Sequence, residues 1–178
     1  EIAQYRDIET LGLYAERTGA GDDPAAFLLG AAANSRDNAR TPVQWTAGKH
    51  AGFTEGAPWI GVNPNHATIN VEAQGDDDAS ILAHYRRLIA LRKEHPVIVH
   101  GDYAPYLEDD PQLFVFARRL GTVRLVVVAN FSGEPARLDV PAELEIAGEC
   151  LVANHAPRDT LAGKVPLAPW EAFAVLSR

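Results

Sequence analysis

The chain has 178 residues, 47% of them hydrophobic and 22% charged, a composition that excludes intrinsic disorder. Its 24 acidic residues outnumber 16 basic ones, and this formal net charge of -8 argues against a nucleic-acid binder. The longest strongly apolar run, residues 125–129, is too short to cross a membrane, no signal-peptide pattern opens the chain, and one cysteine allows no internal disulfide, so we expect a cytoplasmic protein.

Two helices are predicted near the start of the chain. Residues 3–18 carry apolar side chains at three- and four-residue spacing and end at a glycine-containing turn. A second helix is predicted over residues 24–33, because Asp23 precedes Pro24 in the favoured order of a capping residue followed by a first-turn proline.

Residues 34–78 show no sustained periodicity, which is unusual for so long a segment of a compact domain and is usually functional where it occurs. The stretch NSRDNARTPVQW, residues 34–45, is dense in directional hydrogen-bonding groups. We expect the segment to be ordered, with Trp45, Phe53 and Trp59 as buried anchors rather than sugar-stacking platforms.

Residues 79–95 form the clearest predicted helix, with Asp78 as the expected N-cap and one apolar stripe. No element before residue 97 is predicted to cover that stripe. The chain also has no methionine and begins with Glu1, so we expect it to be a piece of a longer protein.

From residue 97 the hydrophobic period changes from 3.6 to 2. Short strands separated by turn signals are typical of an antiparallel β-sandwich, here of roughly 80 residues. The predicted strands are residues 112–119, 123–131, 136–140, 145–153 and 171–177.

Several motifs together resemble one branch of glycoside hydrolase family 13, the α-glucosidase and oligo-1,6-glucosidase branch. The resemblance is strong over residues 1–95 and looser beyond, and Val43 departs from it where the family usually has methionine. The motifs are YRDIETL (5–11), SRDNARTPVQW (35–45), HAGFT (50–54), PWI (58–60), VNPN (62–65), INV (69–71), SIL (80–82), YRRLI (85–89) and LRK (91–93).

This resemblance implies an α+β piece of a (β/α)8-barrel enzyme. Residues 1–96 would be the end of the barrel, namely the long excursion after the eighth strand followed by the final helix. Residues 97–178 would be a C-terminal antiparallel β-sandwich domain. Because loops after barrel strands lie at the catalytic face, the polar stretch would border a sugar pocket.

The implied function is that of a retaining α-glucosidase that hydrolyses terminal α-linked glucose from short oligosaccharides. Retaining hydrolysis needs two carboxyl groups, and in the family these come from earlier barrel strands. No catalytic residue is therefore assigned to this chain, and we expect it to be inactive without the remaining N-terminal barrel portion. We expect no cofactor, and the histidines show no metal-ligand spacing.

The candidate substrate-binding residues are Arg36 and Arg40. By resemblance, Arg36 is expected to reach the glucose at the non-reducing end, because a guanidinium is a planar fork of donors suited to sugar hydroxyls. The alternative to sugar contact for both arginines is that they only pair with Asp37 or loop carbonyls to hold the loop together, and this structural role is the one we favour for Arg40. Asp37, Asn38 and Gln44 are expected to fix the loop by bonds to backbone.

Two other functions stay open. The sandwich at residues 97–178 could be a non-catalytic carbohydrate-binding or assembly module. Within the same family, the complete protein could instead be a trehalose synthase, a sucrose isomerase or a trehalose-6-phosphate hydrolase, since the residues that select linkage and acceptor would lie mostly upstream.

Overall fold

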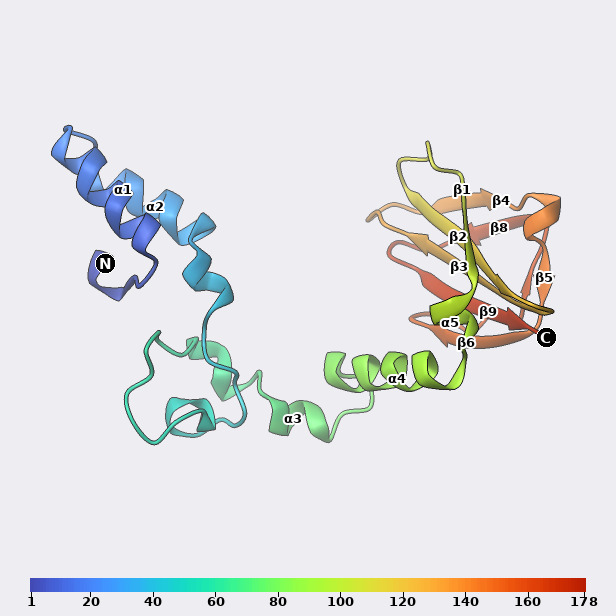
Figure 1. Cartoon of the computed structure of the whole chain (residues 1–178), viewed down its shortest axis with the longest axis horizontal. Coiled ribbons are helices and arrows are strands. Elements are labelled where there is room, and N and C mark those ends of the chain that lie inside the picture. The colour runs from blue at the N-terminus through green and yellow to red at the C-terminus, as the bar shows by residue number, and fades with distance from the viewer. The chain divides into compact units, whose positions relative to one another are not determined.

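The structure, a computed structural model, describes all residues from Glu1 to Arg178. It divides into two compact units, Glu1–His84 and Tyr85–Arg178, and the division falls inside helix α4 (Ile81–Glu94). The first unit is helical and irregular, and the second is built mainly of strands (Figure 1).

In the first unit, helices α1 (Ile8–Gly19) and α2 (Pro24–Asn34) lie side by side (Figure 1). Asp7 caps α1 by accepting from the backbone N–H of Glu9, and Asp23 caps α2 in the same way through Ala25. The rings of Tyr14 and Phe27 meet edge to face across the pair, 5.6 Å between centroids.

The prediction of α2 is confirmed, whereas the start of α1 was predicted five residues too early. Residues Ile2–Gln4 form a separate 3₁₀ turn. The backbone N–H groups of Arg6 and Asp7 both donate to a side-chain oxygen of Asp37, so the chain is extended here and helix begins only at Ile8. A long-range polar contact therefore overrides the local apolar period.

The irregular segment is ordered, as predicted. It contains three 3₁₀ turns and the short helix α3, and backbone bonds hold its two ends together: Val71 N–H donates to Gln44 O at 2.8 Å and Glu72 N–H to Trp45 O at 3.0 Å. The bounds of these elements are Arg36–Ala39, Lys49–Gly52, Pro64–Ala67 and, for α3, Val71–Gly75.

Helix α4 is capped by Ser80 rather than by Asp78. The Ser80 hydroxyl accepts from the backbone N–H of Ala83 at 3.1 Å. This is the usual N-cap geometry, in which the capping side chain binds the N–H three residues further along the chain. After α4 the chain forms the short helix α5 (Val97–His100), which was not predicted.

The second unit contains a five-stranded antiparallel sheet in the order β1-β2-β3-β9-β6, with two-stranded sheets β4-β8 and β5-β7 (Figure 1). In the tight β2–β3 hairpin, Leu113 pairs with Asn130 at the open end and Leu120 with Val123 next to the turn. The strands are β1 (Asp102–Tyr106), β2 (Leu113–Leu120), β3 (Val123–Asn130), β4 (Ala136–Asp139), β5 (Ile146–Ala147), β6 (Glu149–Ala153), β7 (Thr160–Leu161), β8 (Lys164–Leu167) and β9 (Ala172–Ser177).

A continuous apolar core lies on one face of the five-stranded sheet. It combines side chains of β2, β3 and β9 with those of both small sheets, and most of them are inaccessible to water. Its buried members are Leu113, Val115, Ala117, Val126, Val128, Leu138, Leu144, Ile146, Leu161, Val165, Leu167, Phe173 and Val175. A smaller apolar cluster includes Val97, Leu125 and Leu151, and Leu91 of α4 packs against it.

The predicted strand 145–153 is two strands in two sheets. At Gly148, which lies between them, the backbone approaches β9 so closely that a Cβ atom would sit 2.0 Å from Leu176 O. Only glycine fits such an approach, and the glycine separates β5 from β6. Strands β1, β7 and β8 were not predicted: β1 and β8 contain Pro105 and Pro166, which mark edge strands, and β7 has two residues.

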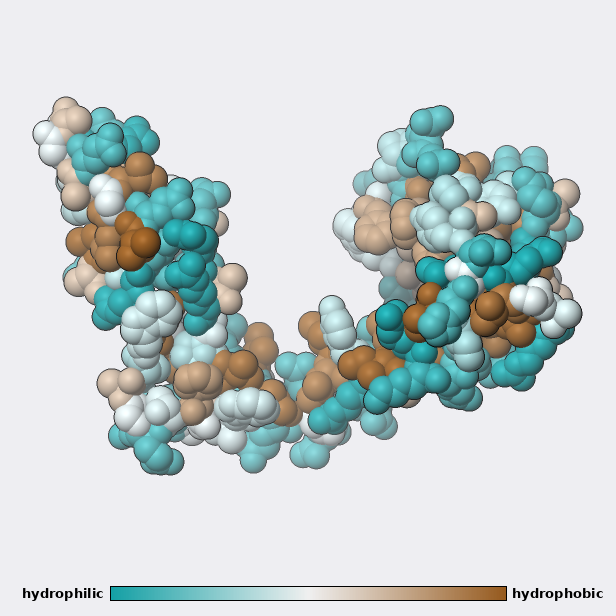
Figure 2. Space-filling model, in the orientation of Figure 1, coloured by the Kyte–Doolittle hydropathy of each residue, from teal (hydrophilic) through white to brown (hydrophobic).

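The first unit exposes many large apolar side chains, and apolar atoms are visible at its surface in Figure 2. Ile8 is 81% exposed and Leu29 76% exposed. None of the helices has the length and apolar composition that a membrane span requires.

Candidate functional site

The polar stretch after α2 folds back onto the first turn of α1. Ser35 ends α2, and its hydroxyl accepts from Asp37 N–H at 3.3 Å, which starts the 3₁₀ turn Arg36–Ala39. The Thr10 hydroxyl lies 3.0 Å from Asp7 Oδ2 and 3.2 Å from Ser35 Oγ. Thr10, Ser35 and both aspartates are buried, so the two segments share a polar interior.

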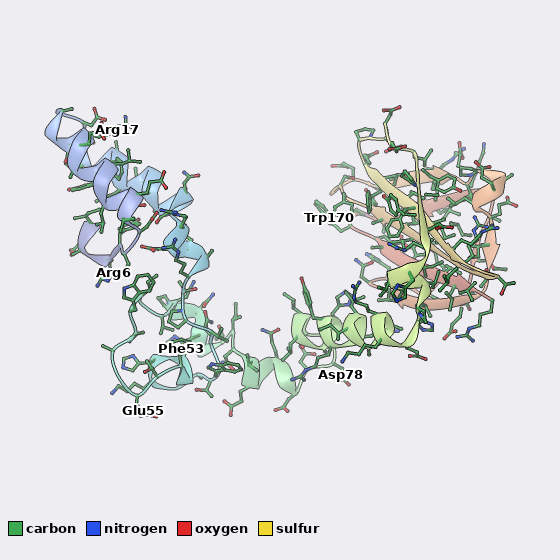
Figure 3. All side chains as sticks on the ribbon, in the orientation of Figure 1. Arg6, Arg17, Phe53, Glu55, Asp78 and Trp170 are labelled. Carbon is green, nitrogen blue, oxygen red and sulfur yellow. The ribbon has the colours of Figure 1, made fainter.

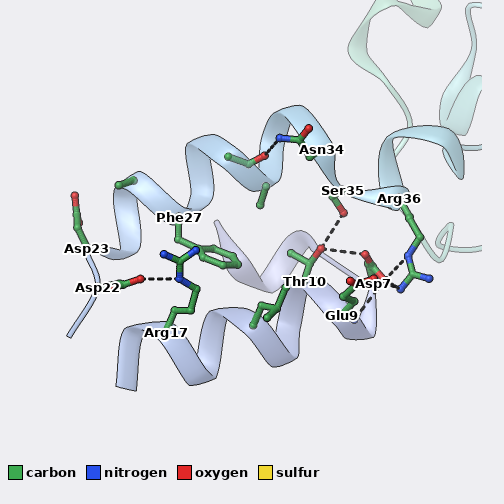
Figure 4. A pocket seen from close by; sticks show the side chains of 14 residues that line it. Asp7, Glu9, Thr10, Arg17, Asp22, Asp23, Phe27, Asn34, Ser35 and Arg36 are labelled. Carbon is green, nitrogen blue, oxygen red and sulfur yellow. Dashed lines mark hydrogen bonds and ion pairs between the residues drawn. The ribbon is translucent and has the colours of Figure 1, made fainter. Parts of the chain in front are cut away.

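Arg36 is paired within the chain. Its Nε and Nη2 lie 3.1 and 2.5 Å from Asp7 Oδ1, and Nη2 also lies 3.2 Å from Glu9 Oε2 (Figure 4). The Arg36 hydrogen bond holds the pKa of Asp7 down at about 2, and the same contact raises the pKa of Arg36. The alternative role considered for Arg36 from the sequence was pairing with Asp37 or loop carbonyls, but its contacts within the chain are to Asp7 and Glu9.

Asp37 anchors the turn with one of its two oxygens. Its Oδ2 accepts from Arg6 N–H at 2.6 Å and Asp7 N–H at 3.0 Å. Its Oδ1 is buried and accepts no hydrogen bond. The predicted side-chain-to-backbone role of Asp37 is therefore confirmed, and that of Asn38 is confirmed by its 3.0 Å bond to Ala32 O.

Arg40 is the less engaged of the two candidate arginines. Its Nη1 lies 3.8 Å from Asp37 Oδ1, which is within ion-pair range but too long for a hydrogen bond. Its guanidinium makes no hydrogen bond, and its side chain is 38% exposed. Further along, the Gln44 amide donates to Ile69 O, as expected for a residue that fixes the loop.

A pocket of about 620 Å³ opens between α1 and α2, with Arg36 and its carboxylate partners at one end and the exposed ion pair Arg17–Asp22 at the other (Figure 4). Apolar side chains of both helices form its middle. The lining residues are Asp7, Glu9, Thr10, Leu13, Arg17, Asp22, Asp23, Ala26, Phe27, Gly30, Ala31, Asn34, Ser35 and Arg36. Arg40 is not part of this lining.

The three aromatic residues expected to be buried anchors are exposed. Trp45, Phe53 and Trp59 all have about half or more of their surface accessible (Figure 3 labels Phe53). The segment is instead held by backbone and amide hydrogen bonds, and the buried apolar side chains within it are small or few, among them Ala51 and Ile60. No group of three or more His, Cys, Asp or Glu side chains has a geometry that could hold a metal ion.

The partners of Arg36 that sequence reasoning missed are Asp7 and Glu9. They lie 29 and 27 positions before Arg36, so no local pattern joins them to it. One signal was present: Asp7 stands immediately before an apolar-periodic helix, where a capping aspartate is typical. A capping role would not have indicated the arginine that shares its oxygen.

A family profile described as "Alpha amylase, catalytic domain" matches residues 8–101. Two curated relatives match 99% of this chain and contain it within 32% of their own length. They are an oligo-1,6-glucosidase of Halalkalibacterium halodurans, 41% identical over 179 residues, and a palatinase of Erwinia rhapontici, 42% identical over 177 residues.

A solved structure of similar fold is the trehalose-6-phosphate hydrolase of Bacillus licheniformis, in a complex of its R201Q mutant. It superposes with a TM-score of 0.87 and 36% identity, covering 98% of this chain and 32% of that one. The chain thus spans about a third of the length of the relatives that it matches.

Proposed function

Because the chain belongs to the alpha-amylase family, we propose that it is the C-terminal portion of a retaining α-glucosidase that removes terminal α-linked glucose from short oligosaccharides. In this proposal residues 1–96 are the end of a (β/α)8 barrel and residues 97–178 a β-sandwich domain. The observation that carries it is the 41% identity to an oligo-1,6-glucosidase over 99% of this chain.

The chain contributes sugar-binding groups and leaves the cleavage chemistry to the rest of the protein. A retaining glycosidase needs an acid/base carboxyl and a nucleophilic carboxylate roughly 5 to 5.5 Å apart. The two buried carboxylates near the site are both engaged, Asp7 by Arg36 and Asp37 by two backbone N–H groups. A pKa of about 2 also makes Asp7 unsuited to hold a proton for a leaving group near neutral pH.

Of the two candidate arginines, Arg40 has the geometry that better supports direct contact with sugar. Arg36 already directs Nε and Nη2 at Asp7 and Glu9, so a sugar hydroxyl would compete with two charged acceptors. Arg40 has no hydrogen bond to give up, and its five N–H donors remain available to hydroxyl groups or to a carboxylate from elsewhere in the protein. We therefore assign sugar contact to Arg40 and the fixing of the α1–α2 junction to Arg36.

The activity is tested with the complete protein that contains this chain. We expect hydrolysis of isomaltose or maltose with retention of anomeric configuration. We expect Arg40→Ala to lower kcat/KM by about a hundredfold, since a binding site made for hydroxyl groups loses strongly when one donor is removed. Unchanged kcat/KM in Arg40→Ala would overturn the binding assignment, and no hydrolysis of any α-glucoside would overturn the activity.

A second candidate within the family is supported by the structural match to a trehalose-6-phosphate hydrolase. The same assay separates the two candidates when trehalose 6-phosphate and sucrose are included as substrates. Preferential cleavage of trehalose 6-phosphate would favour this candidate, and conversion of sucrose to an isomer without net hydrolysis would favour an isomerase. Binding of oligosaccharide without turnover would favour a carbohydrate-binding module.

A further inference from the structure

Only 9% of the Asp37 side-chain surface is accessible to solvent, and its two oxygens differ in their surroundings. Oδ2 accepts two backbone hydrogen bonds, which account for the attachment of the turn to the start of α1. Oδ1 accepts none, although buried carboxylate oxygens in folded proteins ordinarily have partners. Loop anchoring explains one oxygen and leaves the other without a function.

The unpartnered oxygen has one cation within ion-pair distance. Arg40 Nη1 lies 3.8 Å from Asp37 Oδ1, about 1 Å beyond an ordinary charge-assisted hydrogen bond. The Arg40 backbone is held in place, because its N–H donates to Asp37 O at 3.0 Å. A side-chain torsional change is therefore enough to close the gap, with no movement of the turn.

We propose that Asp37 is a positioning residue for substrate binding: its Oδ1 takes up a hydrogen bond from Arg40 and so orients the Arg40 guanidinium toward the sugar. The inference rests on the proposed function, because it needs Arg40 to contact substrate. Asp37 itself does not touch the sugar. Its Oδ2 fixes the turn and its Oδ1 fixes the side chain that the turn presents, so one buried carboxylate sets both the backbone and the guanidinium.

The substitution Asp37→Asn separates the two roles. The amide oxygen of asparagine can replace Oδ2 and keep the two backbone bonds, while its NH2 group then faces Arg40, donor against donor. A variant that removes the side chain altogether, Asp37→Ala, would lose the anchor as well and would test folding rather than positioning. Thermal unfolding of each variant reports the anchor, and sugar kinetics report the orientation of Arg40.

The experiment is a double-mutant cycle on the complete protein with Asp37→Asn, Arg40→Ala and the double variant, measured as kcat and KM for the preferred α-glucoside. We expect Asp37→Asn to lower kcat/KM by about tenfold, mainly through KM, and to have no further effect in the Arg40→Ala background, the signature of two residues that act as one unit. Restoration of wild-type KM by supplying a guanidinium salt to Arg40→Ala, but not to the double variant, would support the same conclusion.

The outcomes distinguish the two levels of the proposal. If Arg40→Ala leaves KM and kcat/KM unchanged, the proposed function of Arg40 fails, and the role of Asp37 fails with it. If Arg40→Ala lowers kcat/KM but Asp37→Asn does not, or if Asp37→Asn causes its full loss also in the Arg40→Ala background, only the positioning role of Asp37 is overturned. A loss in Asp37→Asn that equals its loss of folded protein would likewise assign it to the anchor alone.

Discussion

Each of the two units of this chain is stabilised internally by a different kind of interaction. In Tyr85–Arg178, thirteen buried apolar residues form one core, twelve of them from the large sheet and both small sheets and the last, Leu144, from the 3₁₀ turn Ala142–Leu144. In Glu1–His84 the buried residues are mostly polar, including Asp7, Thr10, Ser35 and Asp37, while large apolar side chains are exposed. We therefore expect the second unit to be stable by itself, whereas the first unit has a defined polar junction without an apolar core.

The two units also differ in where candidate binding residues lie. In proteins generally, a packed apolar core provides a rigid scaffold, and binding residues often lie on irregular segments at the surface. Here the candidate site residues Arg36 and Arg40 both belong to the unit without an apolar core. We expect the exposed apolar side chains of that unit to be covered in the complete protein, in keeping with the third of the relatives' length that the chain spans.

The largest expected effect follows from separating the units before Ala79. We expect residues 79–178, which include all of α4, to unfold in one cooperative transition, because the core of the second unit and its α4 contacts are retained. Residues 1–78 alone are expected to show no cooperative transition. Thermal unfolding followed by circular dichroism tests this. Cooperative unfolding of residues 1–78 would contradict the statement that the first unit lacks a core that makes it stable by itself.

Alanine substitutions of one buried and one exposed leucine test the same difference between the two units. Leu138 of β4 is fully buried, and we expect Leu138→Ala to cost about 2–5 kcal/mol of unfolding free energy, from lost transfer energy and the cavity left behind. Leu29 of α2 is 76% exposed, and Leu29→Ala is expected to change stability by less than about 0.5 kcal/mol in this chain. Chemical denaturation measures both. A large cost for Leu29→Ala in the complete protein, but not in this chain, would show that the rest of the protein covers α2.

Two ion pairs of the second unit form another matched set. Glu171 is 4% exposed and lies 2.8 Å from Arg158. Burial raises the pKa of Glu171, but hydrogen bonds from Arg158 and Ala168 N–H outweigh it and hold the pKa below its usual value. Arg158→Ala would leave a buried carboxylate unpaired, so we expect a cost of about 3 kcal/mol.

The control for this prediction is Arg137→Ala. Arg137 and Asp139 are 3.3 Å apart on the surface, and both side chains are more than half exposed. Such pairs contribute less than about 1 kcal/mol. Equal unfolding free energies for Arg158→Ala and Arg137→Ala in urea would contradict the importance of the buried pair.

The smallest expected effect is a pH dependence in the first unit. The pKa of Asp7 is about 2 in the folded chain against a usual value of 3.8. A depressed folded-state pKa contributes stability that is fully present above about pH 4 and is lost as the pH falls through about 2. We expect Asp7→Asn to be less stable than wild type at neutral pH and the difference to shrink between pH 4 and pH 2. Melting temperatures of the complete protein and of its Asp7→Asn variant across that range measure it, because the first unit by itself is not expected to melt cooperatively, and a constant difference would contradict the assigned role of Arg36.

Much of the fold could be predicted from the sequence where the signal is local. The Asp23-Pro24 pair gives α2 its start, and the alternating strands β2, β3 and β9 follow from a period of two. The edge strands β1 and β8 were missed because their prolines argue against strand, and the split at Gly148 depends on how closely β9 approaches.

The candidate site, too, could be predicted from the sequence only where the signal is local. The resemblance of residues 35–45 to a family motif made the two arginines candidates, which stay predictions, and local chemistry identified Asp37 as an anchor, which its bonds to backbone confirm. The choice between the arginines depends on Asp7 and Glu9, which reach Arg36 only after α1 and α2 have paired. Partners that are brought together by tertiary structure leave no spacing to read in the sequence.

We propose that Arg40, oriented by Asp37, binds the sugar while Arg36 holds α1 to α2. The most direct measurement is a crystal structure of the complete protein soaked with glucose. We expect the Arg40 guanidinium within about 3 Å of a glucose hydroxyl and of Asp37 Oδ1, with Arg36 still paired to Asp7. Glucose bound to Arg36 with Asp7 released, or bound with no contact to Arg40, would contradict the claim.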